Sequence, residues 1–168
     1  NQTMLRIDLP VALAPGQSVT FNIDWSYQIN DQKVLVERSG YEYFEEDKNT
    51  IFQIAQWFPR MAAYYDAVGW QHKQFLGSGE FTLEFGDYEL YLTVPSDHVV
   101  AATGELQNPA AVLSAAQRER LAKAKNSNTP LLVITPQEAL AAEKGKPAGT
   151  KTWHFKAANV RDVAWASS

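Results

Sequence analysis

Strict alternation of apolar and polar residues runs through residues 19–29 and constrains the fold more than any other feature of the sequence. Every second position from Val19 to Ile29 carries an apolar side chain, and polar side chains lie between them. A period of two places all the apolar side chains on one face of an extended chain, whereas a helix would scatter them around its circumference. The pattern therefore predicts a half-buried β-strand over residues 19–29.

A shorter alternation precedes this segment. Leu5, Ile7 and Leu9 alternate with charged residues, and the turn-forming sequence Ala-Pro-Gly-Gln at residues 14–17 separates them from residue 19. Turn residues between two period-two segments are typical of neighbouring strands. We therefore predict an antiparallel pair formed by residues 5–9 and 19–29.

A second long alternation covers residues 81–94 and changes its parity halfway. Apolar residues occupy odd positions from Phe81 to Phe85 and even positions from Tyr88 to Val94. A straight strand cannot keep both sets on one face, because a shift of one residue turns every side chain to the opposite face. We predict a β-bulge or a tight bend at Gly86–Asp87, with the strand ending at Pro95.

Helical signals are confined to residues 113–143. Residues 113–125 are rich in Ala, Glu, Lys, Arg and Gln, which is typical of a surface helix. Thr135-Pro136-Gln137-Glu138 is a capping box with proline at the first helical position, so a second short helix should cover residues 137–143 and end at Gly145. The apolar run at residues 131–134 predicts a short strand between the two helices.

The remaining segments return to strand patterns. Residues 99–102 predict a short strand before a Thr103-Gly104 turn, and residues 152–157 and 163–165 alternate again. About eight strands and two short helices predict an all-β fold, with antiparallel sheets arranged as a β-sandwich or saddle. Residues 1–168 then form a single domain with a helical insertion at about 110–145.

Charge and composition limit the possible partners. The 168 residues carry a net charge of -4, and their 15 Lys and Arg residues are scattered, whereas a phosphate-binding face needs them clustered. No apolar run is long enough to cross a membrane. We therefore expect no nucleic-acid partner and no membrane segment. The chain has no cysteine, which leaves its cellular compartment open.

No motif for metal or nucleophile chemistry is present. His72, His98 and His154 each lack a second histidine within four residues, so they do not predict a zinc site. The serine of Gly77-Ser78-Gly79 does not stand in a G-x-S-x-G motif, and this segment predicts a bend between strands. The acidic residues 45–47 lack the ligand spacing of a calcium loop and predict a solvated turn.

Aromatic side chains are concentrated in residues 57–70, and two interpretations are open. Trp57, Tyr64, Tyr65 and Trp70 could form a platform that stacks on sugar rings, as in a carbohydrate-binding β-sandwich module. Aromatic residues of all-β domains are more often packed in the protein interior. Two coplanar, solvent-exposed rings on one face would favour the carbohydrate-binding function.

Several motifs occur in a defined order along nearly the whole chain. Trp-Phe-Pro-Arg begins at residue 57, Glu-Phe-Gly-Asp-Tyr at residue 84, and Ala-Thr-Gly-Glu-Leu-Gln-Asn-Pro at residue 102. With them the sequence resembles the N-terminal domain of the aminopeptidase N family (gluzincins) of zinc metallopeptidases, in its bacterial branch. The segments that carry the resemblance are residues 56–66, 80–88, 94–95, 101–109 and 159–168.

The resemblance implies a non-catalytic part of a larger enzyme. In that family a saddle-shaped β-domain precedes a catalytic domain with the zinc-site motifs H-E-x-x-H and G-x-M-E-N, neither of which occurs in this chain. It implies no catalytic residues and no cofactor here, zinc in the parent protein, and two partners: the parent's catalytic domain and the N-terminus of a peptide substrate. We expect that the chain alone neither hydrolyses peptides nor binds zinc stoichiometrically.

The resemblance also implies a role in binding the substrate's amine. In the family a Gln or Glu of this domain helps to bind the α-amino group, because a side-chain oxygen accepts a hydrogen bond from an ammonium group. Gln56 matches this role best and Gln53 is the second choice, since both precede the aromatic-Pro-Arg segment. The residues expected to support the loop are Trp57, Pro59, Arg60 and Asp66, the last two as a charged pair.

Both ends of the sequence indicate a piece of a longer protein. The sequence starts with Asn1-Gln2-Thr3 rather than with an initiator methionine and a signal, and residues 160–168 have strand character up to the last residue. We expect an excised part of the N-terminal β-domain. The bacterial branch favours a periplasmic or secreted location.

Overall fold

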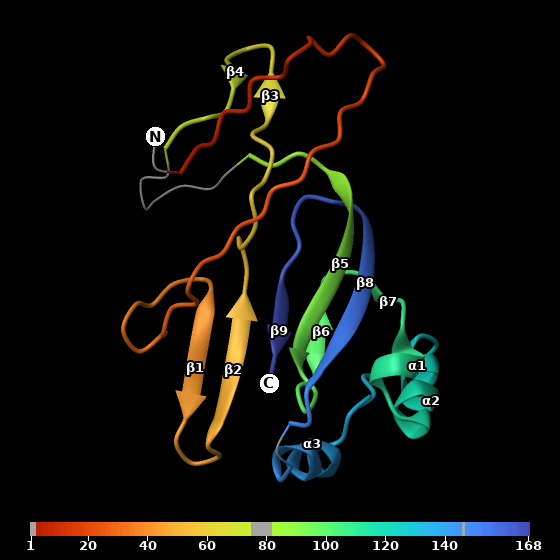
Figure 1. Ribbon diagram of the computed structural model, residues 1–168. Coiled ribbons are helices and arrows are strands. Elements are labelled where there is room, and N and C mark those ends of the chain that lie inside the picture. The colour runs from red at the N-terminus through yellow and green to blue at the C-terminus, as the bar shows by residue number, and fades with distance from the viewer. Residues whose placement is uncertain (1–2, 75–81, 146) are drawn as a thin grey trace. The chain divides into compact units, whose positions relative to one another are not determined.

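The computed structural model describes residues 3–74, 82–145 and 147–168 (Figure 1). By its internal contacts the chain divides into two compact units, which we describe separately. The first consists of Asn1–Gln28 and Phe58–Phe85, and the second of Ile29–Trp57 and Gly86–Ser168. Among the described residues, no helix has the length and apolar character needed to cross a membrane.

Two antiparallel sheets form the framework of the second unit. The four-stranded sheet has the order β1-β2-β9-β6, and the three-stranded sheet has the order β5-β8-β7. The prediction of an all-β fold with short helices is confirmed. The strands are β1 (Gly40–Phe44), β2 (Asn49–Ile54), β5 (Gly86–Pro95), β6 (Val100–Ala102), β7 (Glu105–Leu106), β8 (Thr150–Val160) and β9 (Trp165–Ser167).

The core of the second unit is centred on the pairing of β5 with β8. Leu90 lies opposite Phe155 and Leu92 opposite Trp153, and all four side chains are buried. The four-stranded sheet adds Ile54 and Val100 to the buried residues. Burial of each such side chain stabilises the fold by about 1.5–3 kcal/mol. The alternation in the sequence therefore predicts the buried face of both long strands correctly.

The predicted irregularity at Gly86–Asp87 is confirmed, although the extra residue belongs to the partner strand. Gly86 pairs with Val160 and Tyr88 with Ala157, so β5 advances by two residues while β8 advances by three. The Asp87 carboxylate accepts a hydrogen bond from the backbone N–H of Asn159 at 2.9 Å. The bulge is thus held by a side chain of the strand that does not bulge.

Three helices follow β7: α1 (Pro109–Val112), α2 (Ala115–Ala124) and α3 (Pro136–Glu143). The predicted surface helices correspond to α2 and α3, and α3 begins with the expected Thr135–Glu138 capping box. The single turn of α1 has no counterpart among the helices predicted from the sequence. The predicted strand at residues 131–134 is wrong: the Val133 carbonyl accepts a hydrogen bond from the Arg120 side chain at 2.8 Å instead of a strand neighbour.

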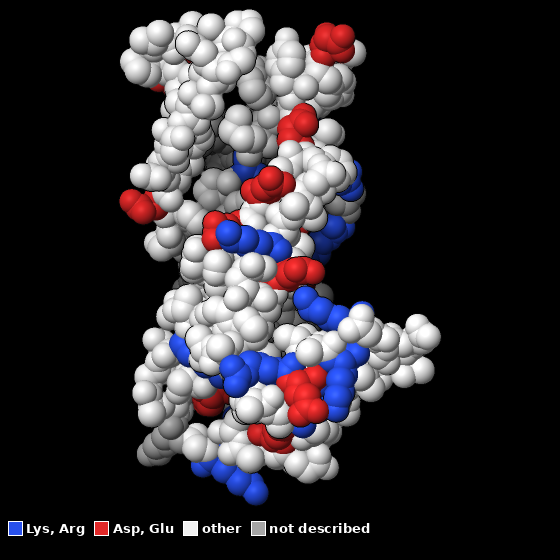
Figure 2. All heavy atoms as spheres, turned by 90° about the vertical axis from the view of Figure 1, so that its right-hand side faces the viewer, with Lys and Arg blue, Asp and Glu red and all other residues white. Residues whose placement is uncertain are grey.

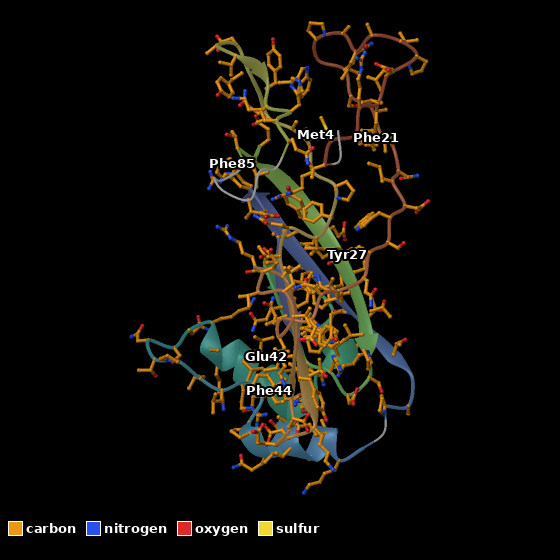
Figure 3. The ribbon with its side chains drawn as sticks, turned by 90° about the vertical axis from the view of Figure 1, so that its left-hand side faces the viewer. Met4, Phe21, Tyr27, Glu42, Phe44 and Phe85 are labelled. Atoms are coloured by element: carbon orange, nitrogen blue, oxygen red, sulfur yellow. The ribbon has the colours of Figure 1, made fainter. Side chains whose placement is uncertain are left out.

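The first unit differs most from the sequence predictions. Its described residues contain the short strands β3 (Tyr64–Tyr65) and β4 (Gly69–Trp70), and the strands predicted at 5–9 and 19–29 are absent. Figure 3 shows Phe21 and Tyr27 on a segment drawn without a strand arrow. The alternation assigns two faces to a segment, but a strand also needs a hydrogen-bonded neighbour, which no local pattern specifies. The predicted bend at residues 77–79 and Phe81 lie outside the described residues. Residues 82–85, the rest of the first half of the 81–94 alternation, were predicted to be strand but are not, because β5 begins at Gly86.

Substitution of Gly104, in the turn between β6 and β7, can show how tightly this region is packed. Its φ is +101°, and a Cβ atom there would lie 2.4 Å from the carbonyl oxygen of Lys156. Gly149 has a φ of +116° but nothing within 4 Å of its Cβ position, so it provides a matched control. We expect Gly104→Ala to lower the free energy of unfolding by about 1–3 kcal/mol more than Gly149→Ala, in urea denaturation. Equal losses in the two variants would contradict the close approach.

The Arg120–Glu138 ion pair between α2 and α3 predicts a pH dependence. Hydrogen bonds from the Arg120 guanidinium, and then from the Thr135 backbone, lower the pKa of Glu138 from 4.5 to about 2. Because the folded-state pKa is depressed, this stabilisation is complete above pH 4.5 and is lost as the pH falls towards about 2. In urea titrations at several pH values, Glu138→Gln should lack this pH-dependent part of the free energy of unfolding. Glu46→Gln, in the exposed β1–β2 turn, should retain it. If the free energy of unfolding fell with decreasing pH in the same way in the wild type and in Glu138→Gln, the role of the ion pair would be refuted.

Candidate functional site

The two glutamines predicted to bind the substrate's amine lie at the end of β2. Gln53 is within the strand, opposite Gly40 of β1 and Ala166 of β9, and its side chain is exposed. Gln56 follows the strand, is also exposed, and has a φ of +53°. A left-handed backbone costs a residue other than glycine roughly 1–2 kcal/mol. Gln56 is therefore an exposed residue in a strained conformation.

Anchors on both sides hold the chain at this turn. Before Gln56, Ile54 is buried and the backbone N–H of Ala55 donates to the Ser39 hydroxyl at 3.1 Å. After it, the Trp57 indole N–H donates to the carbonyl of Val163 at 3.1 Å. Strained residues persist only where their surroundings impose the conformation, and such positions are frequent in functional sites. From this fixed position the amide of Gln56 can both accept and donate hydrogen bonds.

The other residues expected to support the loop belong to the first unit. Pro59 is exposed, Arg60 is half-buried, and Asp66 lies in the exposed turn between β3 and β4. Trp57, by contrast, lies in the same unit as Gln56 and packs edge-on against Trp165, with ring centroids 6.3 Å apart. The structure thus places Trp57 beside Gln56, while the charged pair of Arg60 and Asp66 stays a prediction.

The exposed aromatic residues of the β3–β4 hairpin form a tilted pair. The ring centroids of Tyr64 and Trp70 are 5.2 Å apart, with 70° between the ring planes, and both side chains are more than half exposed. This edge-to-face arrangement is a favourable aromatic contact. It does not present two coplanar rings, so this pair gives no specific support to a carbohydrate-binding platform.

The three histidines make separate local contacts. The Nδ1 atom of His72 lies 2.8 Å from the Trp70 carbonyl, and that of His98 lies 3.2 Å from the Ser167 hydroxyl. His154 contacts Glu89. Within residues 3–74, 82–145 and 147–168, no three His, Asp or Glu side chains gather into a possible metal site.

A polar cluster on the outer face of the β5–β8 pair was not anticipated. One carboxylate oxygen of Glu89 lies 2.7 Å from His154 Nε2, 2.9 Å from the Tyr91 hydroxyl and 3.2 Å from Lys156 Nζ. The Tyr91 hydroxyl and the Lys156 ammonium lower the pKa of Glu89. Sequence alternation indicates that these residues face outward, but only the strand register brings them together. The polar groups of the cluster serve as one another's hydrogen-bond and ion-pair partners, as expected of a stabilising surface cluster.

Acidic and basic side chains are interspersed on the face shown in Figure 2. Lys and Arg side chains form a row across the lower half of this view, with Asp and Glu side chains next to it. Comparison of the chain with protein families, with curated proteins and with solved structures found no match in any of the three.

The strained backbone of Gln56 can be tested by glycine substitution. Gln56→Gly removes the steric penalty of the left-handed conformation and should raise the free energy of unfolding by up to about 1 kcal/mol. The matched control is Gln53→Gly in β2, which should lower it by about 0.5–1 kcal/mol. Urea denaturation of both variants measures the two effects. A loss of stability in Gln56→Gly equal to that of the control would exclude the left-handed turn.

Proposed function

We propose that this chain is the N-terminal, non-catalytic β-domain of a zinc-dependent metallo-aminopeptidase. In this role it supports the catalytic domain and helps to bind the N-terminal amine of the peptide substrate. Such a parent enzyme would remove N-terminal residues from peptides, with a zinc ion held by residues outside this chain that would supply an activated water molecule. The choice of this enzyme class rests on the order of the sequence motifs that begin at residues 57, 84 and 102.

The structural observation that carries the supporting role is the apolar surface of the first unit. Among the described residues of the first unit, Ala63 is the only apolar residue that is buried. Exposed apolar side chains that gather into a contiguous patch are typical of an interaction surface. A neighbouring catalytic domain would cover it. The large apolar side chains exposed in this unit are Leu5, Ile7, Leu9, Val11, Leu13, Val19, Phe21, Trp25, Tyr27, Met61, Tyr64, Tyr65, Val68, Trp70 and Phe85.

The conformation of Gln56 supports the second role, the binding of an amine. Its amide oxygen accepts a hydrogen bond, and the ammonium group of a peptide N-terminus has three N–H donors. The anchors at Ile54 and Trp57 hold the backbone on both sides, so little freedom of the main chain is lost when a substrate binds. A hydrogen bond to a charged group contributes about 1.5–3 kcal/mol.

The decisive experiment begins with the sequence that follows Ser168 in the encoding gene. We expect G-x-M-E-N and H-E-x-x-H motifs within roughly 150 residues. In that full-length enzyme, Gln56→Ala should lower kcat/KM for aminoacyl p-nitroanilides by about tenfold or more, and Gln53→Ala should have a smaller effect. The acetylated form of each substrate provides the control, because it lacks the ammonium group.

Two results would overturn the proposal. One is a gene that stops near Ser168 without a catalytic domain. The other is stoichiometric zinc binding by the 168-residue chain, measured by metal analysis after dialysis, because the parent's zinc ligands should lie outside it. An unchanged kcat/KM in Gln56→Ala would remove the amine-binding role and leave the supporting role in place.

A further inference from the structure

The loop of residues 30–39, which leads into β1, is closed by two side-chain amides at its start. The amide of Gln32 donates to the carbonyl of Glu37 at 2.9 Å and accepts from the N–H of Glu37 at 3.0 Å. The amide of Asn30 donates to the carbonyl of Leu35 at 3.0 Å. Side-chain amides can replace backbone partners in this way, because they carry both a donor and an acceptor. These bonds hold the last residues of the loop next to its first ones.

Gly40, which follows the loop, packs directly against the same amides. It is buried, and a Cβ atom at this position would lie 2.6 Å from Nε2 of Gln32 and 2.8 Å from the carbonyl oxygen of Asn30. Such a close approach to other atoms is possible only for glycine. The next residue, Tyr41, donates from its N–H to the Asn30 carbonyl at 2.9 Å and accepts from the Gln32 N–H at 3.0 Å. Ser39 is therefore held by the closed loop on one side and by the start of β1 on the other.

The hydroxyl of Ser39 contacts the turn that carries Gln56. It accepts a hydrogen bond from the N–H of Ala55 at 3.1 Å, in a partly buried position. Ala55 lies just beyond the end of β2 and directly before Gln56, whose φ is +53°. A left-handed conformation is unfavourable for glutamine, so it depends on contacts that fix the backbone on either side. The Ser39 hydroxyl supplies one of these contacts from a separate, rigid segment of the chain.

We propose that Ser39 is a positioning residue for Gln56. Its hydroxyl fixes the backbone before the left-handed turn and so holds the Gln56 amide ready to accept a hydrogen bond from the substrate's ammonium group. This inference rests on the proposed function, because it takes Gln56 as the residue that binds the amine. Ser39 acts through Ala55 and does not itself touch the substrate. Without the hydroxyl, Gln56 also adopts extended conformations, and the affinity for the amine falls by the fraction of molecules that leave the left-handed turn.

Substitutions of Ser39 in the full-length enzyme test this role. Ser39→Ala removes the acceptor and should lower kcat/KM for aminoacyl p-nitroanilides about fivefold. Ser39→Thr keeps the hydroxyl and should retain most of the wild-type value. If Ser39→Ala does not fold, Ser39→Cys keeps the test possible, because the thiol is of similar size but a weak acceptor, and it should give an intermediate loss.

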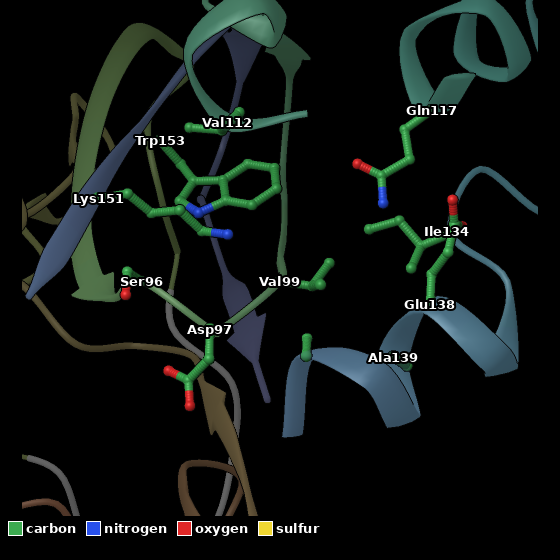
Figure 4. Close-up of a pocket in the computed structure, with 11 residues that line it drawn as sticks. Ser96, Asp97, Val99, Val112, Gln117, Ile134, Glu138, Ala139, Lys151 and Trp153 are labelled. Carbon is green, nitrogen blue, oxygen red and sulfur yellow. The ribbon is translucent and has the colours of Figure 1, made fainter. Parts of the chain in front are cut away.

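Ser96 provides a matched control. Its hydroxyl accepts from the N–H of Ala148 at 3.1 Å, the same distance and the same kind of bond as between Ser39 and Ala55. Figure 4 shows Ser96 at the end of β5, among the residues that line a small pocket. Ser96→Ala therefore loses an equivalent hydrogen bond at a turn that does not carry Gln56. It should leave kcat/KM unchanged.

The double variant Ser39→Ala/Gln56→Ala separates positioning from a general effect on the fold. If Ser39 acts only through Gln56, adding Ser39→Ala to Gln56→Ala should lower kcat/KM by less than about twofold further. A purely structural role would add its full loss. NMR of the 168-residue chain gives an independent measurement. The backbone amide signal of Gln56 should shift in Ser39→Ala and stay close to its wild-type position in Ser39→Thr and Ser96→Ala.

The outcomes distinguish this inference from the proposed function. A loss of kcat/KM in Gln56→Ala together with the wild-type value in Ser39→Ala would overturn the positioning role and leave the amine-binding role in place. A loss from Ser39→Ala that adds in full to that of Gln56→Ala would do the same. An unchanged kcat/KM in Gln56→Ala would remove the amine-binding role and this inference with it.

Discussion

The antiparallel pairing of β5 with β8 is the interaction on which the rest of the second unit depends. Its inner face contributes Leu90, Leu92, Trp153 and Phe155 to the core. Its outer face brings Glu89 next to His154 and Lys156. Because side chains alternate across a sheet, one register determines both sets of contacts at once. A slip of one residue would expose the core side chains and bury the charges.

The two units differ in how they bury apolar surface. The second unit has a core drawn from both of its sheets, and three helices without buried residues lie on its surface. In the first unit, by contrast, the large apolar side chains of the described residues are mostly exposed. Folding must offset a large loss of chain entropy, and it does so mainly by burying apolar surface. The first unit therefore buries little of its apolar surface within itself, and these exposed side chains are the physical basis of the supporting role proposed above.

Sequence patterns predict this fold well where the signal is local. The capping box at Thr135 and Glu138 specifies the start of α3, because its hydrogen bonds join residues three positions apart. The buried faces of β5 and β8 follow from the period of two. The same period failed at residues 19–29, where the described structure has no strand. Strand formation there depends on a partner elsewhere in the chain or outside it, and the pattern carries no information on that partner.

The candidate sites show the same division between local and distant information. The sequence alone establishes the all-β class, the helix caps, the alternating faces and the absence of an H-E-x-x-H motif, because each of these depends on residue type and short spacing. Tertiary structure alone shows the left-handed backbone of Gln56 and the cluster around Glu89. These features join residues that lie far apart in the chain or depend on anchors on both sides of a turn. Side chains so placed meet only after strand register and helix packing have brought their backbones together.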